Sequence, residues 1–311
     1  MTRDIDRRDF LALAGIGGLA FASGLVGCAA GGATAPATAA AAGSPAVAPA
    51  SPARDFFFLQ LSDTHWGFQG PPNPQADVTL EHAVTTINAV DMRPDFVVFT
   101  GDLTHTTDDR VVRRERMKRF RDIVAKLKVK DVRFLPGEHD AGPDRGEAYR
   151  EIFGEPTYAF DHEGVYFVAL DNVSLPGNTL GEAQLSWLEA AVARVPAGAP
   201  LVVLAHRPLF ELYPEWDWFT KDGTRAIETV ARRGPATVFY GHIHQEHHFA
   251  TGAVQHHDAR SLVFPLPAPG SAPKRAPLPW DPASPDHGLG WREIGARAGT
   301  PAPRVREIAY R

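Results

Sequence analysis

Residues 56–65 read Phe56-Phe57-Phe58-Leu59-Gln60-Leu61-Ser62-Asp63-Thr64-His65, so an apolar run passes directly into a group of polar residues. A short, continuous apolar run bounded by turn-forming residues is typical of a buried β-strand. We therefore predict a strand over residues 56–61. The polar residues that follow then lie at the carboxyl end of this strand.

The pattern recurs along the chain beyond residue 54. Apolar runs predict further strands at 96–99, 132–135, 201–204 and 238–240. Between these strands, apolar residues recur at helical spacing at 117–127, at 181–195 and in the series Leu80, Ala83, Val84, Ile87 and Val90. Alternating strands and amphipathic helices predict an α/β layered domain. We interpret the basic run at 110–121 as the solvated face of its helix.

Two hairpins are also predicted. Residues 158–160 and 165–170 flank a tight turn at 161–164, and residues 291–294 pair with 305–309 near the carboxyl end. Because a hairpin adds antiparallel pairs to the parallel ones, we expect mixed sheets. The proline-rich stretch at 265–285 predicts an irregular surface loop.

Nearly every predicted strand is followed by Asp, Glu or His. Ligands of open α/β sheets bind outside the carboxyl ends of the strands, so we expect these side chains to converge on one crevice. The segments concerned are Ser62-Asp63-Thr64-His65, Thr100-Gly101-Asp102, Pro136-Gly137-Glu138-His139-Asp140, Ala205-His206 and Gly241-His242-Ile243-His244.

The residue types in these segments suit a metal site. Residues two apart in extended backbone point the same way, which predicts that Asp63 with His65, and His242 with His244, each face a common site. The glycines at 101, 137 and 241 suit sharp turns close to a metal. Carboxylate oxygens and imidazole nitrogens without a thiolate favour Mn, Fe or Zn.

Taken together, the five segments resemble the motifs of the calcineurin-like metallophosphoesterase superfamily, over about residues 56–248. The resemblance implies a four-layer α/β/β/α sandwich, in which mixed β-sheets are flanked by helices, and two divalent or trivalent metal ions about 3.5 Å apart. It also implies that one metal is held by Asp63, His65 and His244, that the other is held by Glu138, His206 and His242, that Asp102 bridges both, and that His139 is the catalytic histidine beside the scissile phosphate.

The chain departs from this family at two positions. The family usually has Asn at the position of Glu138, and Glu adds a negative charge and a methylene, which leaves the metal preference and the distance to His139 open. Many relatives carry an Asp that orients the catalytic histidine at the position of His105. Either His105 or Asp140 is a candidate for that role here.

The function that the resemblance implies is hydrolysis of a small phosphate ester by a hydroxide activated between two metals. A phosphodiester is placed slightly before a phosphomonoester, because the chain resembles cyclic-nucleotide-type members. One alternative is a noncatalytic metal-binding lipoprotein of the cell envelope, which would have no need of His139. Another dinuclear metallohydrolase, such as an amidohydrolase barrel, requires regular βα units, and the hairpin near residue 160 argues against it.

Several further residues allow two interpretations each. Trp66 and Phe68 either line a substrate cleft or pack against the sheet. Arg207 either binds a phosphate oxygen or pairs with a surface acid. Ordinary hairpin or surface positions are the preferred interpretation for His247, His248, His256 and His257.

Composition limits the class of partner. The chain has 311 residues and 44% hydrophobic content, which is sufficient for a substantial core. Its net charge is -5, with 32 basic and 37 acidic residues. A nucleic-acid polymer is not an expected partner, because its recognition needs an excess of basic side chains.

The amino-terminal region predicts export and anchoring. Arg7 and Arg8 precede an apolar stretch at 11–26, as in a twin-arginine export signal, and the stretch is shorter than the roughly 20 residues of a membrane-spanning helix. Leu25-Val26-Gly27-Cys28 resembles a lipobox, and Cys28 is the chain's one cysteine. We expect a signal at 1–27, a lipidated Cys28 with an Ala/Pro/Gly-rich tether at 28–53, and a metallophosphoesterase domain at 54–311. The protein would then be lipid-anchored in the periplasm or cell envelope.

Overall fold

The computed structural model describes residues 54–310, so the predicted export signal and lipidated tether lie outside the described residues. The strands are β1 (Phe56–Leu61), β2 (Phe96–Thr100), β3 (Val132–Leu135), β4 (Tyr158–His162), β5 (Val165–Ala169), β6 (Leu201–Leu204), β7 (Ala236–Tyr240), β8 (His247–Thr251), β9 (Val254–Asp258), β10 (Gly290–Ala296) and β11 (Arg304–Ala309). The helices are α2 (Ala76–Ala89), α3 (Arg110–Val124), α4 (Glu138–Ala141), α5 (Glu147–Phe153), α6 (Glu182–Ala193) and α7 (Gly223–Ala231), with 3-10 turns η1 (Gly142–Asp144) and η2 (Pro214–Trp216). No helix in this part of the chain is long and apolar enough to cross a membrane.

The strands form two mixed sheets. The first has the order β11-β10-β1-β2-β3, and the second has the order β4-β5-β6-β7-β9-β8. Parallel pairs join β1 to β2 and β2 to β3, and likewise join β5, β6, β7 and β9. Both predicted hairpins are present, as the antiparallel pairs β4–β5 and β10–β11.

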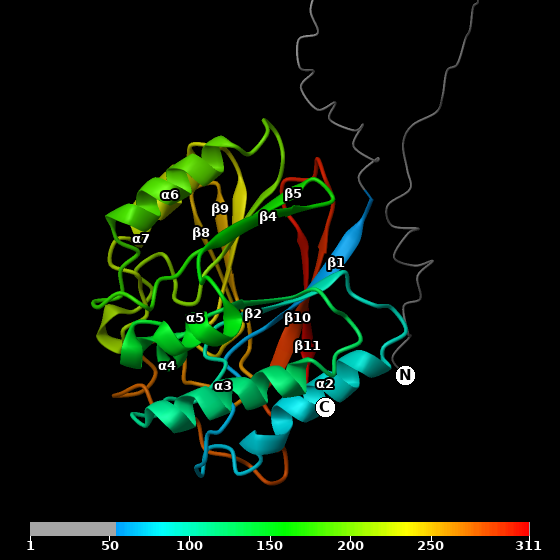
Figure 1. Cartoon of the computed structure of the whole chain (residues 1–311), viewed down its shortest axis with the longest axis vertical. Helices are drawn as coiled ribbons and strands as arrows, with labels where there is room; N and C mark the ends of the chain where they lie inside the picture. Colours follow the sequence, from blue (N-terminus) through cyan, green and yellow to red (C-terminus); the bar gives the residue numbers. More distant parts are fainter. Residues whose placement is uncertain (1–53, 311) are drawn as a thin grey trace, which may run out of the picture. The chain divides into compact units, whose positions relative to one another are not determined.

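Three apolar layers separate the sheets and helices. One lies between the first sheet and α2, α3 and α5, a second lies between the second sheet and α6 and α7, and the third lies between the two sheets. Figure 1 shows the helices on opposite outer sides of the paired sheets. This arrangement confirms the predicted four-layer α/β/β/α sandwich.

The Phe56-Phe57-Phe58 run explains why β1 is central. Successive side chains of a strand point to opposite faces, and Phe56 and Phe58 accordingly enter the layer between the sheets, while Phe57 faces the helices. The Phe58 ring stacks on Phe96 with centroids 4.6 Å apart and meets the edge of Phe167 at 5.5 Å. Burial of one such ring contributes about 2 to 3 kcal/mol, so β1 ties both sheets together.

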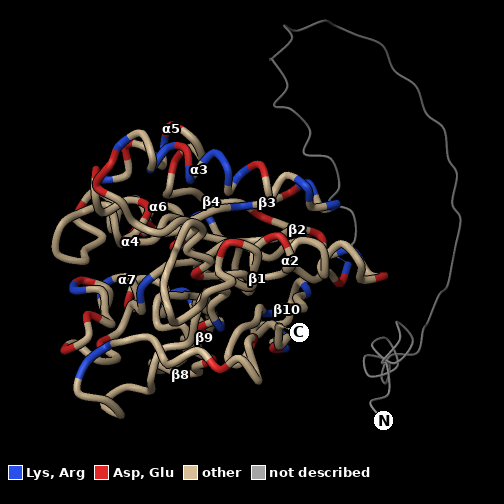
Figure 2. Tube along the Cα trace, turned by 90° about the horizontal axis from the view of Figure 1, so that it is seen from below, with Lys and Arg blue, Asp and Glu red and all other residues tan. Residues whose placement is uncertain are grey.

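The three predicted helices are present, but each ends before the last residue of its predicted stretch. Leu80, Ala83, Val84 and Ile87 are buried on α2, but Val90 is 53% exposed because the helix ends at Ala89. The basic residues of α3 lie mainly on its outer face, where Arg114 pairs with Glu147 and Glu151. Figure 2 shows these charges of both signs along α3 and α5. The solvated-face interpretation therefore holds.

The stretch at 265–285 contains no helix or strand, as predicted. A side-chain hydrogen bond holds it against the domain, and a backbone hydrogen bond joins two of its own residues. Gln245 Nε2 donates to the Pro267 carbonyl at 2.6 Å, and the Leu278 amide donates to the Pro265 carbonyl at 3.0 Å. We call residues 265–285 the strap.

Candidate metal centre

Five strands deliver the predicted polar segments to one place. β1, β2 and β3 end at Leu61, Thr100 and Leu135 in the first sheet, and β6 and β7 end at Leu204 and Tyr240 in the second. Backbone hydrogen bonds connect the loops that follow, including Asp63 N to Gly101 O at 3.1 Å and Gly241 N to His206 O at 2.9 Å. The carboxyl edges of the two sheets thus meet at the same site.

Unusual backbone conformations concentrate at this edge. Nine non-glycine residues of the described part have positive φ, and five of them belong to the predicted ligand set: Asp63, His65, Asp102, His242 and His244. Such conformations cost free energy and persist where the surrounding structure holds them, commonly at functional sites. The prediction of extended backbone at Asp63-x-His65 and His242-x-His244 is therefore wrong.

The error matters most for the two histidines of the last motif. His244 lies with Asp63 and His65, whereas His242 lies with Asp102, Glu138 and His206. Because the left-handed conformations turn the backbone between them, the two rings do not face a common group. The Asp63 and His65 side chains do share one group. They are brought there by left-handed backbone conformations and not by the alternation of side chains along an extended strand.

The first group contains Asp63, His65 and His244, all buried. His244 Nε2 lies 3.3 Å from Asp63 Oδ1 and 3.3 Å from His65 Nε2. The other ring nitrogen of His244 lies 2.7 Å from the Phe264 carbonyl. A ring nitrogen that donates to a carbonyl leaves the opposite nitrogen with a lone pair, which here faces the group.

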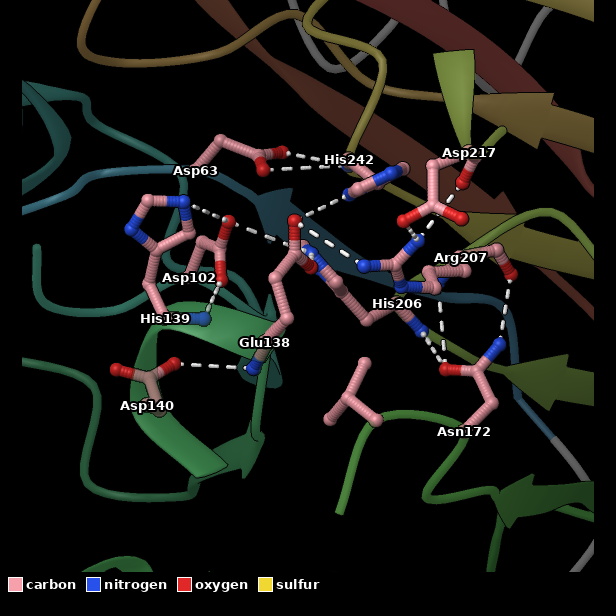
Figure 3. A network of polar contacts seen from close by, with 12 residues as sticks. Asp63, Asp102, Glu138, His139, Asp140, Asn172, His206, Arg207, Asp217 and His242 are labelled. Carbon is pink, nitrogen blue, oxygen red and sulfur yellow. Dashed lines mark hydrogen bonds and ion pairs between the residues drawn. The ribbon is translucent and has the colours of Figure 1, made fainter. Parts of the chain in front are cut away.

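The second group contains Asp102, Glu138, His206 and His242. The Glu138 carboxylate lies 2.9 Å from His206 Nε2 through one oxygen and 2.9 Å from His242 Nδ1 through the other (Figure 3). His206 Nδ1 lies 2.7 Å from the Thr100 carbonyl. That contact assigns the hydrogen of a neutral His206 to Nδ1 and its lone pair to Nε2.

Asp102 connects the two groups. Its Oδ2 lies 3.4 Å from His65 Nε2 in the first group and 3.5 Å from His206 Nε2 in the second. Its other oxygen accepts a hydrogen bond from the backbone amide of His139 at 2.9 Å. One carboxylate oxygen is therefore held by the protein, and the other lies between the groups.

The donor atoms fit metal ions. His206 Nε2 and Glu138 Oε2 are buried, and neither has a hydrogen-bond partner, although they lie only 2.9 Å apart. Two facing acceptors repel each other unless a cation or a proton lies between them. Burial opposes protonation of His206, but the carboxylates of Asp102 and Glu138 outweigh it and raise the His206 pKa well above its ordinary value. The same attraction would hold a metal ion.

Close packing around these groups requires glycine. A Cβ atom on Gly137 would lie 2.0 Å from Asp102 Oδ1, and one on Gly241 would lie 2.0 Å from Ser62 Oγ and 2.7 Å from Asp63 Oδ2. These distances are far below van der Waals contact. The predicted need for small residues beside the site is therefore confirmed.

Comparison with known proteins places this geometry in a family. The calcineurin-like phosphoesterase profile matches residues 58–246, which include all the candidate ligands. The chain belongs to the calcineurin-like phosphoesterase family. It is therefore a metallophosphoesterase, as the strand-end motifs predicted.

Relatives of this phosphoesterase carry names that imply different activities. The mouse serine/threonine-protein phosphatase CPPED1 is 28% identical over 220 residues, covering 61% of this chain and 70% of the relative. A probable cyclic nucleotide phosphodiesterase of Rhodopseudomonas palustris is 28% identical over 246 residues, covering 70% of this chain and 83% of the relative. A dimetal phosphatase of Danio rerio has a similar fold, with a TM-score of 0.54, 15% identity, and coverage of 84% of this chain and all of that one.

In this phosphoesterase, His139 lies at the rim of the site, on the short helix α4. Its Nε2 is 4.0 Å from Asp102 Oδ2, and its side chain is 27% exposed, whereas every ligand candidate except Glu138 is buried. Its Nδ1 accepts a hydrogen bond from the backbone amide of Thr106 at 3.3 Å. A neutral His139 therefore carries its hydrogen on Nε2, on the side of the carboxylate.

Neither candidate for orienting His139 has that role in the structure. Asp140 accepts hydrogen bonds from the amides of Leu103, Thr104 and Gly137 at 2.9 to 3.0 Å, so it ties two loops together. His105 Nδ1 lies 3.4 Å from His65 Nδ1, and the His105 ring is tilted by 32° to the His139 ring, with centroids 5.1 Å apart. The Thr106 amide holds His139 instead, and a backbone contact of this kind leaves no signal in the sequence.

Arg207 is buried beneath the second group. One guanidinium nitrogen lies 3.5 Å from Glu138 Oε1, and another contacts the Asp217 carboxylate at 3.1 Å (Figure 3). The surface-acid interpretation is correct for Asp217, but Glu138 is an acid of the site itself. The extra charge of Glu138 is thus balanced by Arg207 as well as by histidines.

Asn172 was missed by the sequence analysis. Its side-chain oxygen accepts hydrogen bonds from the His206 and Arg207 amides at 3.3 Å, and its nitrogen donates to the Arg207 carbonyl at 2.9 Å. Asn172 follows β5, so the strand-end rule that found the other residues also applies to it. It fixes the loop that carries His206.

The structure also decides between the two interpretations given for Trp66, Phe68 and the hairpin histidines. Trp66 packs with the core between the first sheet and its helices. Phe68 lies beside the site, with its ring 5.1 Å from His105 and 5.0 Å from Phe264. The four histidines expected at hairpin or surface positions lie in the β8–β9 hairpin and belong to neither ligand group: His247, His248, His256 and His257.

Proposed function

We propose that this phosphoesterase hydrolyses a small phosphodiester, with two metal ions held by the two groups described above. Asp63, His65 and His244 would hold one ion, and Glu138, His206 and His242 the other. The observation that carries this assignment is the position of Asp102 Oδ2, within 3.5 Å of ring nitrogens from both groups. A single carboxylate in that position suits a bridge between two cations.

The bound metals would supply an activated water nucleophile and charge stabilisation at the phosphoryl oxygens. The chain's own groups then orient these components. The His139 amide fixes the rotation of the Asp102 carboxylate, and the Thr100 and Phe264 carbonyls fix the rings of His206 and His244. Restricted ligand side chains keep their donor atoms directed at the site.

His139 is proposed as the general acid. Its Nε2 hydrogen is directed toward the site by the Thr106 contact at Nδ1, and the ring is more exposed than the ligand candidates. From this position the imidazolium form of His139 can reach the leaving oxygen of a bound ester and donate its Nε2 proton to it. The ring then returns to the neutral form. Proton donation by a positioned histidine typically contributes 10²-fold to 10⁴-fold in rate.

The preference for a diester is supported by the relatives. The Rhodopseudomonas protein, a probable cyclic nucleotide phosphodiesterase, aligns over 83% of its length. A protein named probable glycerophosphodiester phosphodiesterase, from Arcobacter nitrofigilis, is 29% identical over 164 residues. The competing phosphomonoester activity is supported by the name of the mouse relative.

One parallel assay separates these substrates. The purified protein, with its metal content determined, is given bis(p-nitrophenyl) phosphate, p-nitrophenyl phosphate and 3′,5′-cyclic AMP under the same conditions. We expect kcat/KM to be highest for a diester. A higher value for the monoester would overturn the diester proposal and leave the phosphoesterase assignment intact.

Metal identity follows from the donor set. Carboxylates and imidazoles without thiolates favour Mn, Fe or Zn. We expect two ions per chain from this set after reconstitution, measured by elemental analysis. A stoichiometry of one in an active preparation would contradict the dinuclear assignment.

We also propose that the protein is exported and lipid-anchored at the cell envelope. The support is the sequence alone: Arg7-Arg8 before an apolar stretch, and Cys28 in a lipobox-like context. Acyl chains contribute about 0.8 kcal/mol per buried CH₂ to membrane binding. Mass spectrometry of the mature amino terminus and membrane fractionation of a Cys28→Ala variant test this. Unmodified Cys28 in the mature protein would rule out lipidation.

A further inference from the structure

Arg275 reaches the metal centre from the strap. Its Nη1 lies 3.4 Å from His242 Nε2, although Arg275 follows the last predicted ligand by more than thirty residues. The hydrogen bond from Gln245 to the Pro267 carbonyl holds the start of the strap, and the bond from the Leu278 amide to the Pro265 carbonyl closes the strap on itself. Arg275 is thus brought to the site by tertiary structure.

Its charge is not neutralised by a nearby acid. Within residues 54–310, neither Arg275 nor its neighbour Lys274 forms an ion pair with a carboxylate. Both side chains are exposed. An exposed guanidinium at the rim of a phosphoesterase site, without an acidic partner in the described structure, is suited to bind an anion.

The two nitrogens of His242 face different surroundings. Nδ1 points to Glu138 Oε1 at 2.9 Å, inside the second group, and Nε2 points to Arg275. A ring nitrogen that binds a metal carries no hydrogen, so a neutral His242 with a metal at Nδ1 carries its hydrogen on Nε2. Two donors, the Nε2 hydrogen and the guanidinium, would then face each other without an acceptor.

An anionic oxygen between these donors would satisfy both. Nε2 lies on the side of the ring away from Glu138, so such an anion lies outside the metal group and is not the scissile phosphate. We propose that Arg275 and His242 Nε2 form a subsite for a second acidic group of the substrate. This inference rests on the proposed phosphodiesterase function and narrows its substrates to phosphodiesters that carry a further phosphate or carboxylate.

Paired substrates test the subsite. Glycerophosphoserine differs from glycerophosphoethanolamine by one carboxylate, and the dinucleotide pTpT differs from TpT by one 5′-phosphate. We expect the metal-loaded wild-type protein to have a KM roughly tenfold lower for the member with the additional acid in at least one pair, as for a charge-assisted hydrogen bond. The pair that shows the difference identifies the acidic group as carboxylate or phosphate.

Two variants distinguish a specific contact with Arg275 from a general attraction of acidic substrates to exposed basic side chains. Arg275→Ala should raise KM for the member with the additional acid by roughly tenfold and so remove the difference in KM within the pair. Lys274→Ala removes the adjacent exposed charge and should retain the difference. The subsite proposal is wrong if Arg275→Ala changes KM equally for both members of each pair. It is also wrong if Lys274→Ala removes the difference in KM as Arg275→Ala does.

A binding measurement keeps this test independent of turnover. Calorimetric titration with 3-phosphonopropionate and ethylphosphonate, which are not hydrolysed and differ by one carboxylate, should show roughly tenfold tighter binding of the former to the wild type. Equal affinities, together with equal KM values within both substrate pairs, overturn the subsite. Loss of turnover on every diester, with the affinity difference retained, would instead overturn the phosphodiesterase proposal alone.

Discussion

The backbone amide of His139 donates a hydrogen bond to Oδ1 of Asp102 at 2.9 Å. The residue proposed as the general acid is therefore tied by its main chain to the carboxylate proposed as the metal bridge. Because Oδ1 is occupied by this contact, only Oδ2 faces both ligand groups. This one hydrogen bond therefore positions both the proposed general acid and the proposed bridging carboxylate.

Asp102→Asn should separate folding from activity. The asparagine oxygen can keep the His139 contact, and its NH₂ group then replaces Oδ2, where it cannot bind a cation. We expect an unchanged circular dichroism spectrum and a fall in kcat/KM of at least about 100-fold, on the scale of lost transition-state charge stabilisation. Asp161→Asn, on exposed β4, is the matched control. Wild-type turnover of Asp102→Asn would rule out the bridging assignment.

His139→Ala tests whether the centre is catalytic or only binds metal. His139 lies with His65 and His105 and not with Asp63 or Asp102, so metal content should remain at the wild-type level. Turnover should fall by about 10²-fold to 10⁴-fold, as expected for loss of a general acid. His248→Ala, in the exposed hairpin, should be fully active. Retained turnover of His139→Ala would contradict the proposed role.

The pH dependence of the metal-free protein follows from opposite pKa shifts of its histidines. Burial lowers the pKa of His65 and lowers that of His242 to about 4, so their contribution to stability is lost as pH falls below about 6.5. The raised pKa of His206 has the opposite effect. Protonated His206 stabilises the folded state below about pH 6.5, and this contribution is lost as the pH rises through the raised pKa of His206. We expect the Tm of chelator-treated protein to be highest near pH 6.5.

Added metal should stabilise the protein more at high pH than at low pH. Metal binding displaces the proton that the raised pKa of His206 otherwise retains, so affinity increases with pH. The gain in Tm on adding Mn²⁺ or Zn²⁺ should therefore be larger at pH 8 than at pH 6, measured by differential scanning calorimetry. An equal gain at both values would show that His206 is not a ligand.

Asp140→Ala should act mainly on stability. The change leaves the buried amides of Leu103, Thr104 and Gly137 without their acceptor. Unsatisfied buried donors cost about 1 to 3 kcal/mol each, and partial relaxation reduces the sum, so we expect a loss of roughly 3 kcal/mol in the free energy of unfolding. Denaturant titration measures it. A loss below about 0.5 kcal/mol would show that Asp140 does not connect these loops.

Much of the fold was predictable from local pattern. The run at 56–61 and the other apolar runs predicted the strands because burial on both faces requires continuous apolar sequence. Polar residues that end such runs must lie at the carboxyl edges of parallel strands. For this reason the sequence alone identified the candidate ligands, from Asp63 to His244, although it missed Asn172, which follows β5.

Tertiary structure decided how these residues are divided and supported. The left-handed conformations at His242 and His244 send neighbouring rings to different groups, and no local rule predicts positive φ for histidine. The contacts of Thr106 with His139 and of Arg275 with His242 join segments that are distant in the chain. Strand periodicity is a property of adjacent residues, whereas these contacts depend on how loops are folded across two packed sheets. That is the physical reason why the sequence determined which residues form the centre, and only the folded chain determined what each one faces.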